Sequence, residues 1–308
     1  MIYDLTIIGG GPGGVAAGVY AARKRLKTLF VTAEWGGQSI VSEDIQNWIG
    51  TPHIPGTKLA ADFKAHLEEY KSDVVTTKEG VKVTAIEKID GGFKVTADAG
   101  ETHETKAILL TVGSTRRKLT IPGADTFDNK GVTYCASCDG PLYGGMDVVV
   151  IGGGNAAFET AAQLLAYTKS VTLLQRGNEY RADPVTVQKV LANPKMTGIK
   201  NTELLEIKGD KFVKGISYKD LTSGETKEIS ASGIFVEVGL IPSTDFLKGV
   251  VELDKVGHVV VDPRTQMTKT MGIWAAGDCT DGLYHQNNIA AGDAVKALED
   301  IYMHLHTR

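Results

Sequence analysis

Residues 3–14 read Tyr3-Asp-Leu-Thr-Ile-Ile-Gly-Gly-Gly-Pro-Gly-Gly14, an apolar stretch that runs into a glycine-rich loop. The composition of residues 15–25 predicts a helix, and residues 29–32 predict a second strand. Strand, GxGxxG loop and helix in this order are typical of a dinucleotide-binding unit, because glycines let the backbone approach a pyrophosphate at a helix N-terminus. Glu34 lies about twenty residues beyond the loop, where a carboxylate accepts hydrogen bonds from a ribose. The pattern therefore predicts an adenosine-nucleotide site formed by Gly9, Gly11, Gly14 and Glu34.

The same pattern occurs a second time. Asp147-Val-Val-Val-Ile151 runs into Gly152-Gly-Gly154-Asn-Ala-Ala157, a GxGxxA variant, followed by a predicted helix over 156–167 and a strand over 171–174. We assign a second nucleotide to this loop, with Gly152, Gly154, Asn155 and Ala157 as binding residues. Each copy is followed by a helical segment (58–71 and 184–192), short strands with turns, and a closing apolar strand (108–113 and 234–239). The parallel indicates one ancestral unit used twice.

A further strand over 272–278 and a helix over 290–305 have no counterpart in the second copy, so we expect them to complete the first. The sequence thus predicts an α/β fold of two Rossmann-like three-layer domains, the second inserted in the first. We place the first domain at residues 1–114 plus 242–308 and the second at 115–241. Two connecting segments result, near 113–115 and 239–242, and their glycines predict a hinge about which the domains rotate.

Two cysteines, Cys135 and Cys138, stand three residues apart shortly before the second loop. A Cys-x-x-Cys pair closes a small ring whose disulfide opens and re-forms readily, which indicates redox chemistry on disulfides. The alternative, half of a zinc site, requires four ligands, and the sequence has neither a second Cys-x-x-Cys nor a paired Cys-His motif, so we predict no metal. The third cysteine, Cys279, has no obvious mate, and we interpret it as a small buried residue in preference to a third redox centre.

Composition limits the partners. Charged residues make up 23% and hydrophobic residues 42% of 308, which favours a globular protein of two domains. The 33 basic and 37 acidic residues give a net charge of -4, which offers no electrostatic footprint for nucleic acid or anionic lipid. No apolar run approaches bilayer length, and Met1 leads directly into a strand, so we expect a cytoplasmic protein with no membrane partner. Three cysteines exclude a secreted disulfide framework.

Several short motifs carry a likeness to a known family. They are Gly9-Gly-Gly11-Pro-Gly-Gly14, Gly36-Gly-Gln38, Asn47, Thr111-Val-Gly113, Cys135-Ala-Ser-Cys138-Asp139, Gly152-Gly-Gly-Asn155 and Ala275-Ala-Gly277-Asp278. With these motifs in this order, the chain resembles the low-molecular-weight thioredoxin reductase family and, equally, the flavoprotein core of the bacterial alkyl hydroperoxide reductase. The resemblance implies an FAD-binding domain, an inserted NAD(P)-binding domain that carries the dithiol, and a homodimer. The second family normally has an N-terminal domain with another Cys-x-x-Cys; the sequence has none, so we expect electrons to leave through a separate protein.

The resemblance also implies roles for residues of the first domain. FAD would place its pyrophosphate on the Gly9–Gly14 loop, with Glu34 on the adenosine ribose. Gly37, Gln38 and Asn47 match positions near the flavin, Asp278 matches the carboxylate that bonds its ribityl or phosphate portion, and Gln286 would meet the isoalloxazine. Gly113 and Gly277 belong to the matching motifs and are also expected to bind the cofactor, whereas a plain turn residue is the alternative for Gly37. His285 stands where relatives carry Arg or Lys, and an ordinary surface histidine is the alternative.

For the dithiol, the resemblance implies that reduced flavin forms a transient bond with Cys138 and expels Cys135 as a thiolate, which attacks the partner. Asp139 is then the candidate general acid and base, since thiolates must gain and lose protons near neutral pH; a turn cap is the alternative.

Residues 175–181 bear on the choice between NADPH and NADH as the electron donor. NADPH-specific relatives show His-Arg-Arg-x-x-x-Arg there, whereas an NADH user prefers an acidic residue for the free 2'-hydroxyl. Arg176 and Arg181 fall on two of the three basic positions, while Gly177 replaces the middle one and Gln175 is neither histidine nor acidic. We favour NADPH over NADH, and a different donor, such as a ferredoxin or a reduced flavin, stays open.

The sequence therefore predicts a flavin-dependent disulfide reductase that passes electrons to a thioredoxin- or glutaredoxin-like protein. The nearest alternative is a reductase module that feeds a peroxiredoxin system. A redox sensor without turnover, and a dithiol oxidase with oxygen as acceptor, are further alternatives.

Overall fold

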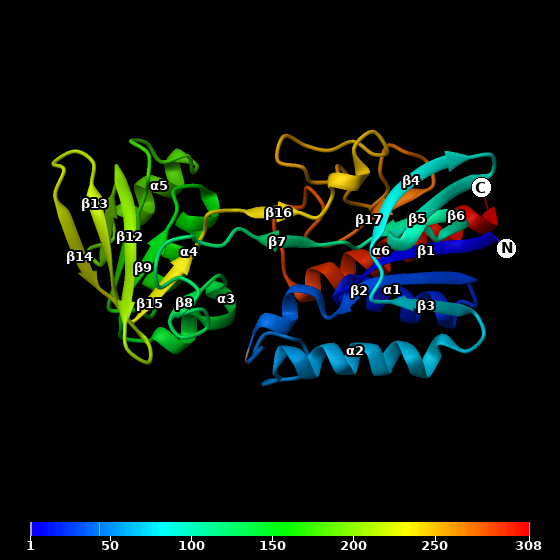
Figure 1. Cartoon of the computed structure of the whole chain (residues 1–308), viewed down its shortest axis with the longest axis horizontal. Helices are drawn as coiled ribbons and strands as arrows, with labels where there is room; N and C mark the ends of the chain where they lie inside the picture. The colour runs from blue at the N-terminus through cyan, green and yellow to red at the C-terminus, as the bar shows by residue number, and fades with distance from the viewer. Residues whose placement is uncertain (1, 43, 308) are drawn as a thin grey trace. The chain divides into compact units, whose positions relative to one another are not determined.

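The structure, a computed structural model, describes residues 2–42 and 44–307, and the chain divides into two compact units. Unit 1 comprises Met1–Thr115 and Ile241–Arg308, and unit 2 comprises Arg116–Leu240. Each unit has its own sheet, mixed in unit 1 and parallel in unit 2 (Figure 1). The fold class is the α/β class expected from the repeated pattern.

Unit 1 is built on a seven-stranded sheet of order β3-β2-β1-β6-β5-β4, with β17 paired to β6. Its strands are β1 (Ile2–Gly10), β2 (Thr28–Trp35), β3 (Val75–Glu79), β4 (Val83–Ile89), β5 (Gly92–Ala97), β6 (Thr102–Leu110) and β17 (Ile273–Ala275). β6 pairs with β5 through its first half and, in parallel, with β17 through its last three residues. The late strand therefore completes the first sheet, as its lack of a counterpart predicted.

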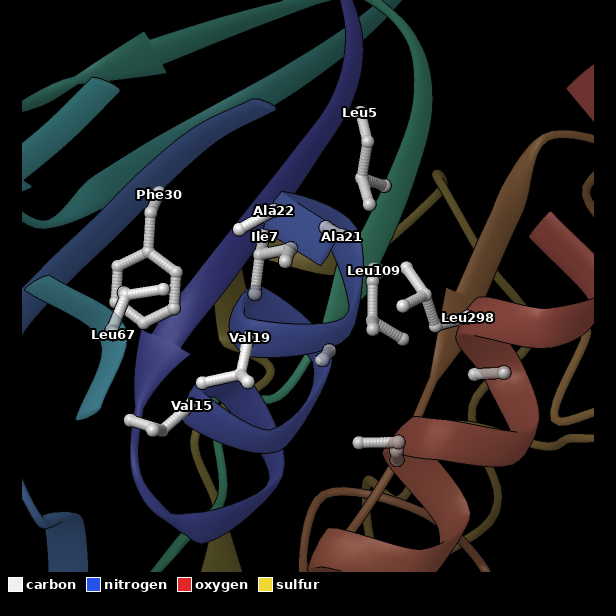
Figure 2. Packing of buried hydrophobic residues seen from close by; sticks show 14 of the residues in the cluster. Leu5, Ile7, Val15, Val19, Ala21, Ala22, Phe30, Leu67, Leu109 and Leu298 are labelled. Carbon is white, nitrogen blue, oxygen red and sulfur yellow. The ribbon is translucent and has the colours of Figure 1, made fainter. Parts of the chain in front are cut away.

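Helices cover one face of this sheet. They are α1 (Pro12–Arg23), α2 (Gly56–Lys71) and α6 (Asn287–Thr307). Successive residues of β6 alternate between the two faces: Leu109 packs with the helices, whereas Ile108 and Leu110 pack on the opposite face with β4, β5 and residues 247–259. Figure 2 shows Val15 and Val19 of α1 in the helix-side cluster, with Phe30 of β2, Leu67 of α2 and Leu298 of α6 around the same core.

Unit 2 has a five-stranded parallel sheet of order β11-β10-β9-β15-β8. Its strands are β8 (Val132–Thr133), β9 (Asp147–Ile151), β10 (Ser170–Leu174), β11 (Met196–Ile199) and β15 (Gly233–Val236). The helices are α3 (Ala136–Asp139), α4 (Asn155–Leu165) and α5 (Pro184–Leu191), and an antiparallel sheet consists of β12 (Thr202–Gly209), β13 (Val213–Asp220) and β14 (Thr226–Ser230).

Unit 2 has three layers, because side chains pack against both faces of β9. Val148 and Val150 pack against α4, while Val149 and Ile151 pack against side chains of β12 and β13. A strand buried on both sides reads as a continuous apolar run, which explains the sequence Val-Val-Val-Ile.

Two segments connect the units. β7 (Ser114–Arg116) and β16 (Leu240–Pro242) pair with each other as a two-stranded ribbon (Figure 1). Gly113 and Gly239 lie just outside these strands with φ of 64° and 105°, a left-handed conformation that favours glycine.

The closing strands are shorter than the sequence predicted. β6 ends at Leu110 and β15 ends at Val236, each three residues before the predicted end. Thr111 and Glu237 still donate their N–H groups to Ile8 and Ile151, but their carbonyls already lie against the glycine loops. α1 begins at Pro12, three residues earlier than predicted, since the fixed φ of proline suits the first helical position. No helix in the described part of the chain is long and apolar enough to cross a bilayer.

Candidate redox and nucleotide sites

The cysteine pair forms a disulfide in unit 2. Cys135 and Cys138 are bonded with their Cα atoms 5.3 Å apart, and both are partly exposed. Cys135 directly precedes α3, and its carbonyl accepts hydrogen bonds from the N–H groups of Cys138 and Asp139 at 3.3 and 3.0 Å. This turn holds the two sulfurs at bonding distance in a partly exposed segment of unit 2.

Helix α4 fixes the dithiol turn through Gln163. Its amide nitrogen donates to the carbonyl of Ala136 at 3.2 Å, and its amide oxygen accepts from the hydroxyl of Ser137 at 3.2 Å. Both bonds reach the residues between the cysteines. Sequence reasoning did not single out Gln163, because no motif links it to a turn 26 residues away.

Asp139 lies next to the disulfide in a setting suited to proton transfer. Burial raises the pKa of its carboxyl, and the hydrogen bond from the Thr133 hydroxyl and the charge of Arg116 oppose part of that increase. Thr133 also accepts a hydrogen bond from the N–H of Cys135 at 3.3 Å, so one hydroxyl connects the carboxyl with the cysteine backbone. A carboxyl with a raised pKa beside a disulfide can hold a proton nearer neutral pH than an exposed one.

Unit 1 has a pocket of about 400 Å³, a size typical of cofactor sites. The pocket brings together eight of the predicted binding residues: Gly9, Gly11, Glu34, Gly37, Gln38, Gly113, Gly277 and Asp278. These residues come from both segments of the unit, so the pocket exists only because residues 241–308 fold back onto the first sheet.

In the Gly9–Gly14 loop, close packing against backbone carbonyls requires glycine at two positions. Gly9 has φ of 120°, and a Cβ there would overlap the carbonyl oxygen of Thr111. A Cβ on Gly14 would overlap the carbonyl of Gly9, which explains why Gly14 is buried and does not line the pocket. Gly11 differs, since nothing lies within 4 Å of its ideal Cβ, so its missing side chain leaves the pocket open to a ligand. A cradle of this kind fits a pyrophosphate.

Asn47 and Gln286 are brought together outside the pocket lining. The Asn47 amide donates to the Gln286 side-chain oxygen at 3.1 Å, although 239 residues separate them. Asn288 donates to the Asn47 carbonyl at 2.7 Å, and Ser39 donates to Asn287, which lines the pocket, at 3.2 Å. The start of α6 is thereby tied to the segment that follows β2.

Other pocket residues were missed. Lys82 and Val83 line the pocket from the start of β4, and Phe246 lines it from the returning segment. Thr111 belongs to a quoted motif, but its contribution is visible only in three dimensions: its hydroxyl donates to the carbonyls of Ile8 and Gly9 at 2.9 and 3.2 Å. No sequence signal near the glycine loop points to the β4 residues.

The loop of unit 2 repeats this geometry. Gly152 has φ of 145°, and a Cβ there would overlap the carbonyl of Glu237 and lie 3.0 Å from the Cβ of Ala157. Nothing lies within 4 Å of the ideal Cβ of Gly154. The side-chain oxygen of Asn155 accepts from the N–H of Asp183 at 2.8 Å. Ala157 is buried beneath the loop, so its role is close packing of helix and strand.

The two candidate phosphate-binding arginines are exposed. Within residues 2–42 and 44–307, Arg176 and Arg181 form no ion pair with a carboxylate. The backbone N–H of Arg181 donates to the Gly153 carbonyl at 2.7 Å, which places this residue beside the loop. Gln175 is buried, its side chain lies against Gly153, and its amide donates to the Glu179 carbonyl at 2.9 Å.

Three further residues have environments that bear on reactivity. Cys279 is fully buried and burial raises the pKa of its thiol to about 11, so it is not a ready thiolate. His285 is partly buried, its ring lies 5.9 Å from that of His258, and its Nε2 has no hydrogen-bond partner within the described residues. Glu237, which no motif singled out, follows β15 and has a pKa raised to about 7 by burial.

No group of three or more His, Cys, Asp or Glu residues in the described part of the chain is placed to hold a metal ion.

Residues 3–294 match the pyridine nucleotide-disulphide oxidoreductase family. The chain is 39% identical over 295 residues to a protein named NADH dehydrogenase from Bacillus subtilis, and 38% identical over 296 residues to the F component of alkyl hydroperoxide reductase from Escherichia coli. Each match covers 96% of this chain and 57% of the relative, so the chain spans little more than half the length of these curated proteins.

Solved structures match over nearly the whole chain. A thioredoxin reductase from Giardia duodenalis is 33% identical, with a TM-score of 0.91 and 98% of both chains covered. A thioredoxin reductase from Streptococcus pyogenes is 31% identical, with a TM-score of 0.90, and the match covers 100% of this chain and 99% of that one.

Proposed function

The chain belongs to the pyridine nucleotide-disulphide oxidoreductase family and is of the thioredoxin reductase type, and we propose that it reduces a thioredoxin- or glutaredoxin-like protein. In this proposal unit 1 binds FAD and unit 2 binds a pyridine nucleotide. The single observation that carries it is the partly exposed Cys135–Cys138 disulfide, with a carboxyl of raised pKa beside it.

The residues of unit 1 fit FAD. The open position at Gly11, the crowded positions at Gly9 and Gly14, and the carboxylates of Glu34 and Asp278 offer a pyrophosphate cradle with hydrogen-bond acceptors on either side. When bound, FAD supplies two-electron transfer between a nicotinamide and a disulfide.

The chain's own residues carry the exchange with the partner. The Cys135 thiolate attacks a sulfur of the partner disulfide, forming a mixed disulfide and releasing one partner thiolate. Cys138 then attacks Cys135, which restores the Cys135–Cys138 bond and releases the second partner thiolate. The two electrons leave with the partner dithiol, and Asp139 gives or takes the protons that the thiolates require.

For the nucleotide we propose NADPH over NADH. Support comes from the exposed guanidinium groups of Arg176 and Arg181 near the loop and from the absence of a carboxylate at Gln175, at the end of β10. The name NADH dehydrogenase on a 39% identical relative supports NADH instead.

An anaerobic titration tests the donor. The protein should be yellow, and NADPH should bleach it at lower concentration than NADH, with colour restored by an oxidised thioredoxin. Bleaching by NADH alone would reverse the nucleotide assignment, and a colourless protein that takes up no FAD would refute the flavoprotein proposal.

Trapping identifies the partner. With Cys138→Ser, the mixed disulfide on Cys135 cannot resolve and should retain the partner; Cys135→Ser is the matched control that should retain none.

Similarity to the F component of alkyl hydroperoxide reductase favours a second candidate function, a reductase module of a peroxiredoxin system. Recovery of a peroxiredoxin-linked disulfide protein would support this candidate over a general thioredoxin.

We also propose, from the resemblance alone, a cytoplasmic homodimer. Light scattering of the FAD-loaded protein should give about twice the mass of 32.9 kDa, and a monomeric mass would contradict it.

A further inference from the structure

The internal repeat makes Thr111 and Glu237 equivalent residues. In unit 1 the N–H of Thr111 donates to the Ile8 carbonyl at 2.9 Å, and in unit 2 the N–H of Glu237 donates to the Ile151 carbonyl at 2.8 Å. Gly9 directly follows Ile8, and Gly152 directly follows Ile151. A Cβ on Gly9 would overlap the carbonyl of Thr111, and a Cβ on Gly152 would overlap the carbonyl of Glu237. Both residues therefore form the floor of a glycine loop.

The position lines a ligand pocket in unit 1. Thr111 is among the residues around the 400 Å³ pocket, together with Gly9 and Gly11. By the same geometry, residue 237 lies beneath the unit 2 loop, on the side where a nucleotide would bind.

The side chains at the two floors differ in chemistry. Thr111 is neutral and its hydroxyl is engaged by the carbonyls of its own loop. Glu237 has a carboxyl whose Oε1 accepts a hydrogen bond at 2.7 Å from the hydroxyl of Thr160, a buried residue of α4.

Charged groups from the neighbouring elements bear on this carboxyl. Burial raises its pKa to about 7; the hydrogen bond from Thr160 on α4 and the positive charge of Arg116 on β7 lower it, and the negative charge of Glu159 on α4 raises it. Arg116 also acts on Asp139, the carboxyl beside the disulfide.

We propose that Glu237 is a positioning residue of the unit 2 nucleotide site, and that dinucleotide binds most tightly when the Glu237 carboxyl is neutral. The reason is electrostatic: an ionised carboxylate beneath the loop repels the anionic pyrophosphate that the loop amides attract. By linkage, bound nucleotide holds the proton on Glu237, and affinity falls as the carboxyl ionises with rising pH. This inference rests on the proposed nucleotide-binding function of unit 2.

The test is a binding measurement without turnover. NAD⁺ and NADP⁺ cannot reduce the oxidised holoprotein, so calorimetry gives their Kd directly for the wild type and for Glu237→Gln. If bound pyrophosphate raises the pKa of Glu237 by about one unit, the wild-type Kd should rise about fivefold between about pH 6 and about pH 8. The Glu237→Gln Kd should stay flat for NAD⁺. For NADP⁺, whose 2'-phosphate titrates in this range, the wild-type to variant ratio of Kd should show the same fivefold change.

Two variants that keep Glu237 provide opposite shifts. Thr160→Val removes the bond that favours the ionised form, so the midpoint should move to higher pH, whereas Glu159→Gln removes a repelling charge and should move it to lower pH. Because these two variants keep Glu237, they test the pH dependence of nucleotide binding even if Glu237→Gln does not fold.

The outcomes are distinct. Parallel pH profiles for wild type and Glu237→Gln, or unmoved midpoints in the two variants, overturn the inference while nucleotide binding stands. No binding of either nucleotide at any pH overturns both the inference and the proposed function.

Discussion

The two glycine loops share one backbone geometry and differ in what lies beneath them. Gly9 and Gly152 both have positive φ and both lie against the carbonyl of the residue that follows the closing strand, whereas Gly11 and Gly154 both face open space. The floor of unit 1 is a neutral hydroxyl and that of unit 2 is a carboxyl with a pKa near 7. The two loops therefore share a backbone geometry that fits a phosphate, whereas the groups beneath them differ in charge and in pKa.

The largest expected effect tests whether sulfur chemistry is confined to unit 2. Cys135→Ser or Cys138→Ser should lower steady-state reduction of a protein disulfide by at least about 10³-fold, because neither can form the redox disulfide. Cys279→Ser, in unit 1, should keep turnover near the wild-type value, since its thiol is buried with a pKa of about 11. Loss of turnover in Cys279→Ser would break the division between the units.

Asp139→Asn tests the proton chemistry of unit 2. Loss of a general acid and base costs about 10²-fold or more in the step it serves, so dithiol exchange should slow by that factor. Rapid-mixing measurement of partner reduction by the pre-reduced protein reports that step. The flavin absorbance of unit 1 should be unchanged, and an unaltered exchange rate would leave Asp139 as a turn residue.

Alanine at the crowded glycines should damage folding equally in both units. Gly9→Ala and Gly152→Ala each combine positive φ with overlap on a carbonyl, which should destabilise the affected unit by about 2 kcal/mol. Thermal unfolding followed by circular dichroism measures the loss. Tolerance of one substitution but not of the other would show that the two loops are not equivalent.

Alanine at the open glycines should separate the ligands of the two units. Gly11→Ala and Gly154→Ala meet no protein atom within 4 Å, so folding should be retained. We expect Gly11→Ala to weaken FAD retention and Gly154→Ala to weaken nucleotide binding, each by about tenfold. FAD content after gel filtration and calorimetric Kd provide the readouts, and crossed effects would contradict the assignment of cofactors to units.

The smallest effect concerns the pH dependence of stability. The pKa of Glu237 rises from 4.5 to about 7 on folding, so the stability that this group contributes is present below about pH 4.5 and is lost as pH rises through about 7. Relative to wild type, Glu237→Gln should gain about 1 kcal/mol in unfolding free energy between about pH 6 and about pH 7. Thr111→Val in unit 1 should change stability by an amount independent of pH, and a pH-dependent change there would remove the contrast.

Prediction from sequence succeeded where the signal was local. The strands and helices around both loops follow from apolar runs and glycine spacing, and the α/β class is confirmed. Boundaries were less accurate: the closing strands end three residues early, because leaving the sheet at Thr111 and Glu237 depends on the loop packed against them. The assignments of individual site residues stay predictions.

Other contributors were out of reach of pattern reasoning. Gln163 and Thr133 each hold the dithiol turn through two hydrogen bonds, and Glu237 lies against Gly152 although it is 85 residues later in the chain. Such residues carry no spacing signature, since any polar side chain of suitable length looks the same in sequence.

By itself the sequence determined a protein with two dinucleotide loops and one dithiol, because glycine spacing and a Cys-x-x-Cys pair act through the local backbone. Only the tertiary structure decided that Glu237 lies beneath the second loop, that the carboxyl of Asp139 is raised in pKa, and that Cys279 is sealed in the core. Burial and charge environment depend on residues distant along the chain, and these set pKa and reactivity.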